Sequence, residues 1–236
     1  MPSYKHLIFD ADHTLINYDA DERGAFLRLF SLLDIALDEK QLARCQFLSV
    51  QAWAEAGLFD VHTEKTQREY HLLYRSHLLR LFSWLFDEMS INADVGGTSE
   101  RFLKELEHIS EPIQGAKELL LSLQGRCRLH VATNGLSTIQ RGRLACFSGL
   151  FDEFFISEEM NVIKPKAEFF EQIFERLHAN KQDCLMIGDS LLSDVAGANG
   201  VGIDSCWFNP QKKPNETEIR PTFEIASFEE LGKILK

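Results

Sequence analysis

Short apolar runs rich in β-favouring residues recur along the chain, and each is followed by loop residues and then by a helical pattern. The runs cover residues 6–9, 129–132, 154–156, 184–187 and 205–208. Amphipathic stretches at residues 137–147 and 167–177 lie between them and place apolar side chains on one helical face. This alternation is typical of an α/β protein with a parallel sheet, in which these stretches are crossover helices.

Residues 17–112 interrupt the alternation, because they contain helical patterns and almost no convincing strand. An apolar stripe at helical spacing runs from Tyr70 to Leu85. We therefore predict a helical domain at residues 17–112, inserted into a core domain formed by residues 1–16 and 113–236. Most aromatic side chains in the insertion are expected to form its core, although a stacking surface for a planar ligand is an alternative.

Composition and charge restrict the partners that this chain can have. Its 236 residues are 44% hydrophobic, enough to bury a core, and a net charge of −11 would repel a nucleic acid polymer. A phosphorylated partner is therefore expected to be a small metabolite that meets local positive groups. Residues 1–5 lack the pattern of a secretory signal, and no apolar run is long enough to span a membrane. The five widely spaced cysteines favour a reducing cytoplasm over a disulfide framework or a zinc site.

Two carboxylates directly follow the first predicted strand. Asp10 and Asp12 are separated by one residue, so both side chains could point into one pocket as the chain leaves the strand. In an open parallel sheet, the carboxyl ends of the strands form the ligand crevice. The pair alone is weak support for a site, because such aspartates often cap a helix or lie in a turn. Its interpretation depends on the residues that follow the other strands.

Polar residues also follow the second and third predicted strands. The second strand ends in Thr133, Asn134 and Gly135, where a hydroxyl and turned backbone amides could bind an anion; a simple turn before a helix is an equal alternative. Further along the chain, Pro165 is expected in the first turn of a helix and fixes Lys164 just before it. A Lys-Pro pair is usually only a helix start, but a lysine at the crevice would offset the charge of a phosphoryl group.

The fourth predicted strand is followed by Gly188, Asp189 and Asp194, and then by small residues that let the backbone come close. Two aspartates after a buried strand are unfavourable unless they bind a cation or accept several hydrogen bonds. Mg²⁺ is the expected cation, because it is held by carboxylates, water and phosphate, whereas the soft ligands of a zinc site are absent.

Taken in order, these motifs resemble those of the haloacid dehalogenase superfamily of phosphatases. The matching residues are Asp10, Asp12, Thr14, Thr133, Lys164, Asp189 and Asp194. The resemblance spans residues 5–208 and implies a Rossmann-like three-layer α/β/α core with an inserted helical C1-type cap. The wording of the motifs is similar to that of bacterial pyrimidine 5′-nucleotidases, a subgroup of noncanonical nucleotide phosphatases. N-acylneuraminate-9-phosphatases are similar in the same places.

The resemblance also implies a mechanism. Asp10 would attack phosphorus to form an aspartyl-phosphate, and Asp12 would protonate the leaving alkoxide and then activate water. Mg²⁺ would be held by the Asp10 side chain, the Asp12 backbone carbonyl and Asp189, so that the anionic nucleophile can approach an anionic ester. The dehalogenases of this superfamily lack an acid/base at the position of Asp12, so dehalogenation is not expected.

The remaining matched residues would support this chemistry. By the same resemblance, Thr133, backbone amides near Asn134, and Lys164 would bind the phosphoryl oxygens. Asp194 would orient either the magnesium shell or Lys164. Thr14 would support the residues of the first motif without contacting the substrate. All of these assignments follow from the match to the superfamily motifs.

His13 departs from the superfamily pattern, which usually has Gly or Asp at this position. We interpret it as a tolerated loop substitution. The alternative is an imidazole beside the acid/base that shifts the pH optimum, because histidine titrates near neutrality.

The expected activity is magnesium-dependent hydrolysis of a small phosphomonoester, with a pyrimidine nucleoside 5′-monophosphate as the leading substrate. The alternatives are a sugar-phosphate or N-acylneuraminate-9-phosphate phosphatase, a phosphomutase, and a non-catalytic protein that binds phosphate esters. A non-catalytic protein would be expected to lack at least one of Asp10, Asp12, Lys164 and Asp189, and all four are present. The sequence leaves the oligomeric state open.

Overall fold

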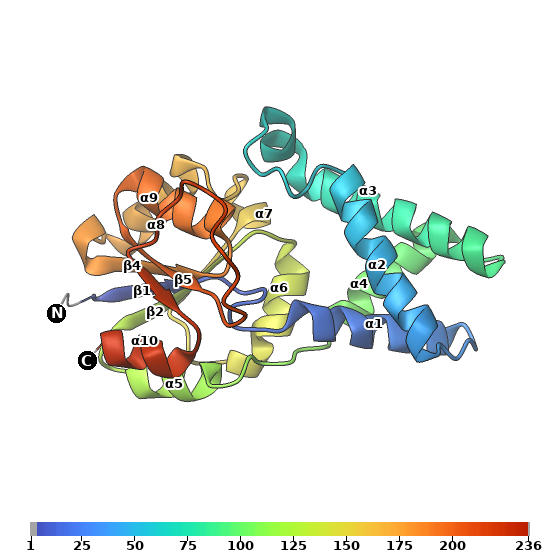
Figure 1. Cartoon of the computed structure of the whole chain (residues 1–236), viewed down its shortest axis with the longest axis horizontal. Helices are drawn as coiled ribbons and strands as arrows, with labels where there is room; N and C mark the ends of the chain where they lie inside the picture. The colour runs from blue at the N-terminus through green and yellow to red at the C-terminus, as the bar shows by residue number, and fades with distance from the viewer. Residues whose placement is uncertain (1–3, 236) are drawn as a thin grey trace. The chain divides into compact units, whose positions relative to one another are not determined.

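A computed structural model describes residues 4–235. Residues 1–3, on which part of the expectation about a secretory signal rests, and residue 236 lie outside it. The chain forms two compact units (Figure 1). The α/β unit comprises the described residues through Asn17, Pro112–Ser137, and the described residues from Leu144 onward; the helical unit comprises Tyr18–Glu111 and Thr138–Arg143. Within the described part of the chain, no helix is both long and apolar enough to cross a membrane.

A parallel sheet forms the middle of the α/β unit, with the strand order β3-β2-β1-β4-β5-β6. The strands are β1 (His6–Phe9), β2 (Arg128–Thr133), β3 (Glu153–Ile156), β4 (Cys184–Gly188), β5 (Asp204–Phe208) and β6 (Phe223–Ile225). The predicted parallel α/β fold is confirmed, and the five predicted strands correspond to β1 to β5. The edge strand β6 was not predicted, because three residues are too few to show a period.

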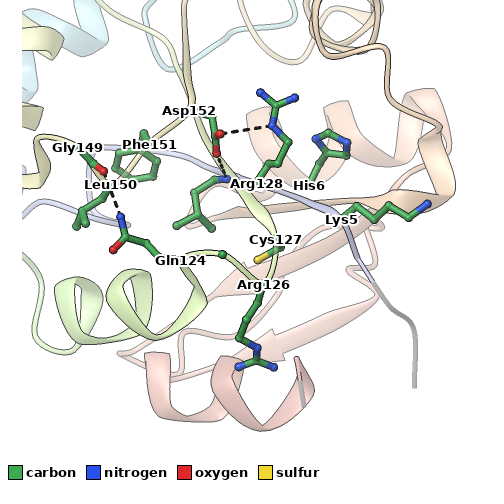
Figure 2. A pocket seen from close by; sticks show the side chains of 12 residues that line it. Lys5, His6, Gln124, Arg126, Cys127, Arg128, Gly149, Leu150, Phe151 and Asp152 are labelled. Carbon is green, nitrogen blue, oxygen red and sulfur yellow. Dashed lines mark hydrogen bonds and ion pairs between the residues drawn. The ribbon is translucent and has the colours of Figure 1, made fainter.

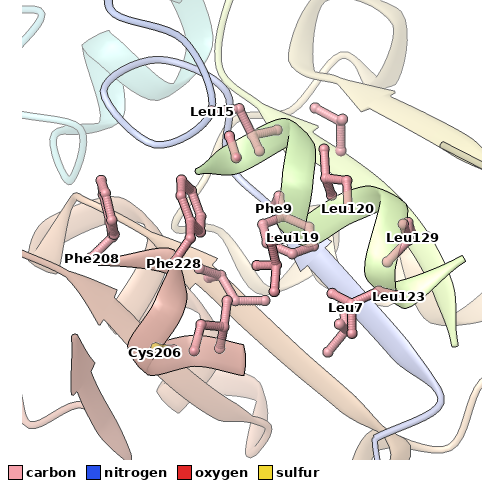
Figure 3. Packing of buried hydrophobic residues seen from close by; sticks show 14 of the residues in the cluster. Leu7, Phe9, Leu15, Leu119, Leu120, Leu123, Leu129, Cys206, Phe208 and Phe228 are labelled. Carbon is pink, nitrogen blue, oxygen red and sulfur yellow. The ribbon is translucent and has the colours of Figure 1, made fainter. Parts of the chain in front are cut away.

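Helices cover both faces of this sheet, which gives three layers. The helices and short turns of the α/β unit are α5 (Ala116–Leu123), η1 (Leu144–Phe147), α7 (Ser157–Met160), α8 (Ala167–Leu177), η2 (Lys181–Asp183), η3 (Leu191–Val195), α9 (Ala196–Val201) and α10 (Phe228–Ile234). Leu7 and Phe9 of β1 pack with α5 and α10 on one face (Figure 3), whereas Ile8 packs with α8 and α9 on the other. Burial on both faces explains why β1 is a continuous apolar run rather than an alternating one.

Two predicted helical stretches have different outcomes. The stretch at residues 167–177 is α8, as predicted. The stretch at residues 137–147 is α6 (Ser137–Arg143) followed by η1, and Thr138–Arg143 belongs to the helical unit. The expectation of one crossover helix was therefore wrong, because the end of α6 carries a buried arginine, Arg143, whose partner lies in the helical unit.

Four long helices make up most of the helical unit: α1 (Tyr18–Leu32), α2 (Glu39–Glu55), α3 (Glu64–Met89) and α4 (Val95–Glu107). Side-chain oxygens of Asp38, Thr63 and Asp94 cap α2, α3 and α4 by accepting hydrogen bonds from their first-turn amides. The rings of Phe26 and Phe102 lie 4.8 Å apart in the core of this unit. The expected aromatic core is therefore present, although some aromatic side chains, such as that of Phe59, are exposed.

One acidic side chain, Glu22 of α1, is buried inside the helical unit and accepts a 2.6 Å hydrogen bond from the Ser49 hydroxyl. Burial raises the pKa of Glu22 to about 7 from an ordinary value of 4.5. Between these values the folded chain keeps a proton that the unfolded chain releases. Because the unfolded state then binds fewer protons, this group makes stability fall as pH rises through that window.

The variant Glu22→Gln should remove this dependence. Relative to the wild type, the free energy of unfolding of the variant should rise by up to about 3 kcal/mol between about pH 5 and about pH 8. Urea unfolding at a series of pH values measures the difference. The variant Glu100→Gln, which removes an exposed carboxylate of the same unit, serves as the control; a Glu22→Gln profile parallel to the wild type would contradict the explanation.

Candidate active site

Lys164 is 1% exposed and lies at the carboxyl edge of the sheet. Its Nζ donates hydrogen bonds to Asp10 Oδ1 at 2.6 Å, to Asp194 Oδ1 at 2.7 Å and to the carbonyl oxygen of Ala132 at 2.6 Å. An ammonium group has three N–H donors, so each donor has an acceptor. Burial disfavours the charged ammonium, but the two carboxylates override this effect and raise the pKa of Lys164 above its usual value.

The strands bring these groups together by their register. Phe9 is paired with Val131 on β2 and with Ile187 on β4, so the three strands end at the same edge of the sheet, within two residues of one another. The backbone N–H of Asp10 then donates to the Ile187 carbonyl at 2.8 Å, which fixes Asp10 at the end of β1. Its side chain is therefore placed beside the groups that follow β2 and β4.

The Asn134 side chain positions the backbone of Lys164. Asn134 Nδ2 donates to the Lys164 carbonyl at 3.0 Å, and the Lys164 N–H donates to Asn134 Oδ1 at 2.8 Å. Pro165 lies in the turn that follows, and α8 begins only at Ala167. The expectation that Pro165 occupies the first turn of the helix was wrong, because the chain turns after Lys164 before the helix starts.

Asp194 is held from two sides. Its Oδ1 accepts from Lys164, and its Oδ2 accepts at 3.0 Å from the N–H of Ser190, the residue before the single π-helical turn η3. A Cβ on Gly188 would lie 2.2 Å from Asp194 Oδ2, so only glycine permits this approach. A π turn of this kind often marks a functional site, and here it directs the aspartate toward the lysine.

Three carboxylates meet at this edge. Asp10, Asp189 and Asp194 each offer an oxygen atom, and these atoms all lie within 4.8 Å of one another. Burial raises the pKa of Asp10 to about 7 against the opposing effect of Lys164, and burial with the neighbouring carboxylates raises the pKa of Asp189 well above its usual value. One lysine does not balance three carboxylates, so this all-oxygen donor set fits a hard divalent cation.

The other predicted residues lie around this cluster. Asp12 is half-buried just beyond β1, and Thr133, the last residue of β2, is buried. Thr14 is also buried, and its hydroxyl has no hydrogen-bond partner among the described residues. His13 is exposed, with a φ of 58°. Gly, Asp and His all tolerate this left-handed backbone region better than most residues, which explains why His13 can replace the Gly or Asp that is usual there.

Several residues that support the site were not predicted. Trp207 of β5 donates from Nε1 to the Asp189 carbonyl at 2.8 Å, and the Ser157 hydroxyl accepts from the Gly135 N–H at 2.9 Å. The register that pairs Gly188 with Trp207 puts the indole beside the residue after β4. In the sequence, Trp207 looks like any apolar residue of a strand, so its hydrogen bond to Asp189 could not be predicted from neighbouring residues.

A cavity of about 550 Å³ lies at the opposite edge of the sheet, around the amino ends of β1 and β2 (Figure 2). Its cations are already engaged: Lys5 with Asp183, Arg128 with Asp152, and Arg126 with the Leu235 carbonyl. The cavity therefore lacks the cluster of carboxylates found around Asp10.

Comparison with known proteins finds relatives that match nearly the whole chain. The chain is 36% identical to the HAD-hydrolase YfnB of Bacillus subtilis, over 100% of this chain and 97% of that protein. A crystal structure of YfnB bound to magnesium superposes with a TM-score of 0.84 at 33% identity and 99% coverage of both chains. The chain is 35% identical to the pyrimidine 5′-nucleotidase PynA of Streptococcus pneumoniae, over 97% of this chain and 93% of PynA.

A more distant relative is the N-acylneuraminate-9-phosphatase of Homo sapiens, which is 27% identical over 98% of this chain and 93% of that protein. The sequence profile of the haloacid dehalogenase-like hydrolases matches residues 4–202. This match takes in every motif residue around Lys164, from Asp10 to Asp194. The chain therefore belongs to the haloacid dehalogenase-like hydrolase family.

Proposed function

We propose that this chain is a magnesium-dependent phosphatase that hydrolyses a small phosphomonoester through an aspartyl-phosphate on Asp10. The observation that carries the proposal is the buried contact of Lys164 with Asp10 and Asp194, beside Asp189. A carboxylate held next to a buried ammonium can attack phosphorus while the positive charge offsets that of the ester.

Each residue of the site has a separate part in the proposed reaction. Asp10 attacks phosphorus and displaces the alkoxide, which takes a proton from Asp12. Asp12 then accepts a proton from the water that cleaves the aspartyl-phosphate, releasing inorganic phosphate and restoring Asp10. Thr133, backbone amides near Asn134, and Lys164 hold the phosphoryl oxygens through both steps.

The acidic cluster is the proposed magnesium site. The Asp10 side chain, the Asp12 backbone carbonyl and Asp189 would hold Mg²⁺, with Asp194 and Thr14 supporting them. When bound, the cation neutralises the carboxylates and the phosphoryl oxygens, which lowers the repulsion between nucleophile and ester. Asp194 already bonds Lys164 and the Ser190 amide, so its contribution is to orient the lysine.

The substrate that we propose is a pyrimidine nucleoside 5′-monophosphate, handled in the cytoplasm. Identity to the nucleotidase PynA is 35%, against 27% for the acylneuraminate phosphatase, which favours a nucleotide over a sugar acid phosphate. Asp12 supplies the acid/base that a phosphatase needs and a dehalogenase lacks. All five cysteines are free thiols, and three of them are buried, which suits a reducing compartment.

Phosphate release measured with Mg²⁺ over a panel of phosphomonoesters tests this proposal. The panel holds pyrimidine and purine nucleoside 5′-monophosphates, hexose phosphates and N-acylneuraminate 9-phosphate. The highest kcat/KM is expected for a pyrimidine nucleotide. A preference for the acylneuraminate or a hexose phosphate would overturn the substrate assignment and leave the phosphatase chemistry standing.

Variants of the two first-motif aspartates separate the chemical roles. Asp10→Asn should abolish turnover and covalent phosphorylation, because the nucleophile is lost. Asp12→Asn should lower kcat by about 10²- to 10⁴-fold while the chain still gains one phosphoryl group in mass when mixed with substrate. Wild-type turnover in Asp10→Asn would rule out the mechanism.

Asn134→Ala should lower kcat/KM by about 10- to 100-fold, because both hydrogen bonds that fix the Lys164 backbone are removed and the lysine loses its position. Steady-state kinetics with the best substrate of the panel measure the effect. The change should leave Asp10 and Asp189 in place, so covalent phosphorylation should persist at a reduced rate.

Asn209→Ala is a matched control, because Asn209 holds the backbone of Lys213 in the same way, with bonds of 2.9 Å to both its N–H and its carbonyl. It should lower stability as Asn134→Ala does, with little change in kcat/KM. Equal kinetic losses in the two variants would show that Asn134 contributes only to folding.

A further inference from the structure

A fully buried ion pair connects α6 with the first turn of α1. Arg143 and Asp21 have side chains that are 1% and 0% exposed. Arg143 Nε and Nη2 donate to Asp21 Oδ2 at 3.0 and 2.8 Å, and the Glu111 N–H donates to Asp21 Oδ1 at 2.7 Å. Arg143 also donates to Gln140 at 3.3 Å and lies over the ring of Tyr18. We call the group formed by Asp21, Arg143 and the Glu111 amide the Asp21 clasp.

The clasp joins residues at three of the four places where the chain passes between the two units. The helical unit begins at Tyr18 and its main segment ends at Glu111, and its second segment ends at Arg143. Asp21 lies three positions after the first of these residues in the sequence and binds the other two, although they are 90 and 122 residues away. A single carboxylate therefore ties α6 to both ends of the inserted helices.

A second contact fastens α6 inside the helical unit. A Cβ on Gly142 would lie 2.5 Å from the backbone carbonyl oxygen of Glu107, the last residue of α4, so no larger residue fits there. Thr138–Arg143 thus belongs to the helical unit through packing as well as through the clasp.

The segment before α6 belongs to the proposed phosphate-binding loop. Residues 133–137 run from the end of β2 to α6 and stay in the α/β unit, where Asn134 holds Lys164 and the Ser137 N–H donates to Glu158 at 2.7 Å. This bridge is five residues long and has little slack. A displacement of α6 therefore acts on the backbone that follows Thr133.

The clasp is also a costly way to obtain stability alone. Burying two charges removes their hydration, and replacing such a pair by apolar residues is often neutral for stability or favourable. What the pair does supply is one fixed arrangement of α6, α1 and Glu111.

We propose that Arg143 is a positioning residue: through the Asp21 clasp it makes α6 move with the helical unit and so sets the position of residues 133–137 for the reaction. The inference rests on the proposed phosphatase function, because it concerns the same phosphate-binding loop. It predicts that phosphate bound at the loop slows amide hydrogen exchange in α6, and that this effect requires the clasp.

The test uses the full-length chain with Asp21→Asn and Arg143→Met together. Both charges are removed, and the asparagine keeps an acceptor for the Glu111 amide, so no unpaired charge is left buried. Amide hydrogen exchange is measured with Mg²⁺ and with or without inorganic phosphate, beside kcat and KM on the best monophosphate. Arg44→Gln with Glu88→Gln, which removes an exposed ion pair of the same unit, is the matched control.

In the wild type and the control, phosphate should slow exchange in residues 133–137 and in residues 138–143 of α6. In the clasp variant the slowing should persist in residues 133–137 but vanish from residues 138–143, and kcat should fall by about 10- to 100-fold with a smaller change in KM. Arg143→Lys keeps the charge without the two-pronged contact and should give an intermediate kcat; it also serves if the double variant does not fold.

If the folded clasp variant shows wild-type exchange and wild-type kcat, the positioning role is wrong and the phosphatase proposal stands. If the double variant does not fold, wild-type exchange and kcat in Arg143→Lys have the same meaning. If the wild type shows neither phosphate protection nor phosphate release, the proposed function fails and the inference fails with it.

Discussion

The buried ammonium of Lys164 is the constraint on which the rest of the site depends. A charge removed from water is tolerated only when its donors are satisfied, and here the acceptors come from three separate elements: Asp10 after β1, Ala132 in β2, and Asp194 in η3. Asp10 and Lys164 are 154 residues apart in the sequence. The sheet register, the Asn134 contact and the glycine at position 188 all serve to bring these atoms within hydrogen-bond distance.

The same constraint explains the electrostatics of the site. Lys164 donates to one oxygen of Asp10 and one of Asp194, while the carboxylate of Asp189 lies beside them and has a raised pKa. In the proposed reaction a divalent cation would supply the charge that the lysine lacks, and both cations would offset the negative charge of a phosphoryl group. The same charges of Lys164 and the three carboxylates thus bear on both the stability of the site and its proposed reaction.

Sequence alone identified the groups that follow the strands. The placement of Asp10, Lys164, Asp189 and Asp194 at one edge of the sheet could be predicted because each follows a predicted strand and parallel strands end at one edge. Their roles came from the resemblance to the superfamily motifs. The fold could be predicted for the same reason, except for β6, whose three residues leave no period. The local sequence pattern was sufficient to place a site residue wherever that residue directly follows a strand or helix with a clear apolar period.

Partners far apart in the sequence were not predictable in this way. Backbone amides near Asn134 were expected to bind an anion, whereas the contact of the Asn134 side chain with the Lys164 backbone was not predicted. The burial of Arg143 against Asp21, which places most of α6 in the helical unit, leaves no periodic signal, and a charged residue reads as solvated surface in the sequence. Contacts of this type depend on tertiary packing, which determines whether a polar side chain is exposed or paired.

The charge balance around Lys164 is tested most directly by the free energy of unfolding measured as a function of Mg²⁺ concentration, for the wild type and for Asp189→Asn. A cation that binds only the folded chain stabilises it by mass action, by about 2.7 kcal/mol at a hundredfold excess over the dissociation constant. The wild type should gain stability in this way, and Asp189→Asn should lose most of the gain. A wild-type stability that does not change with Mg²⁺, or an equal gain in Asp189→Asn, would contradict the assignment of this carboxylate cluster as a cation site.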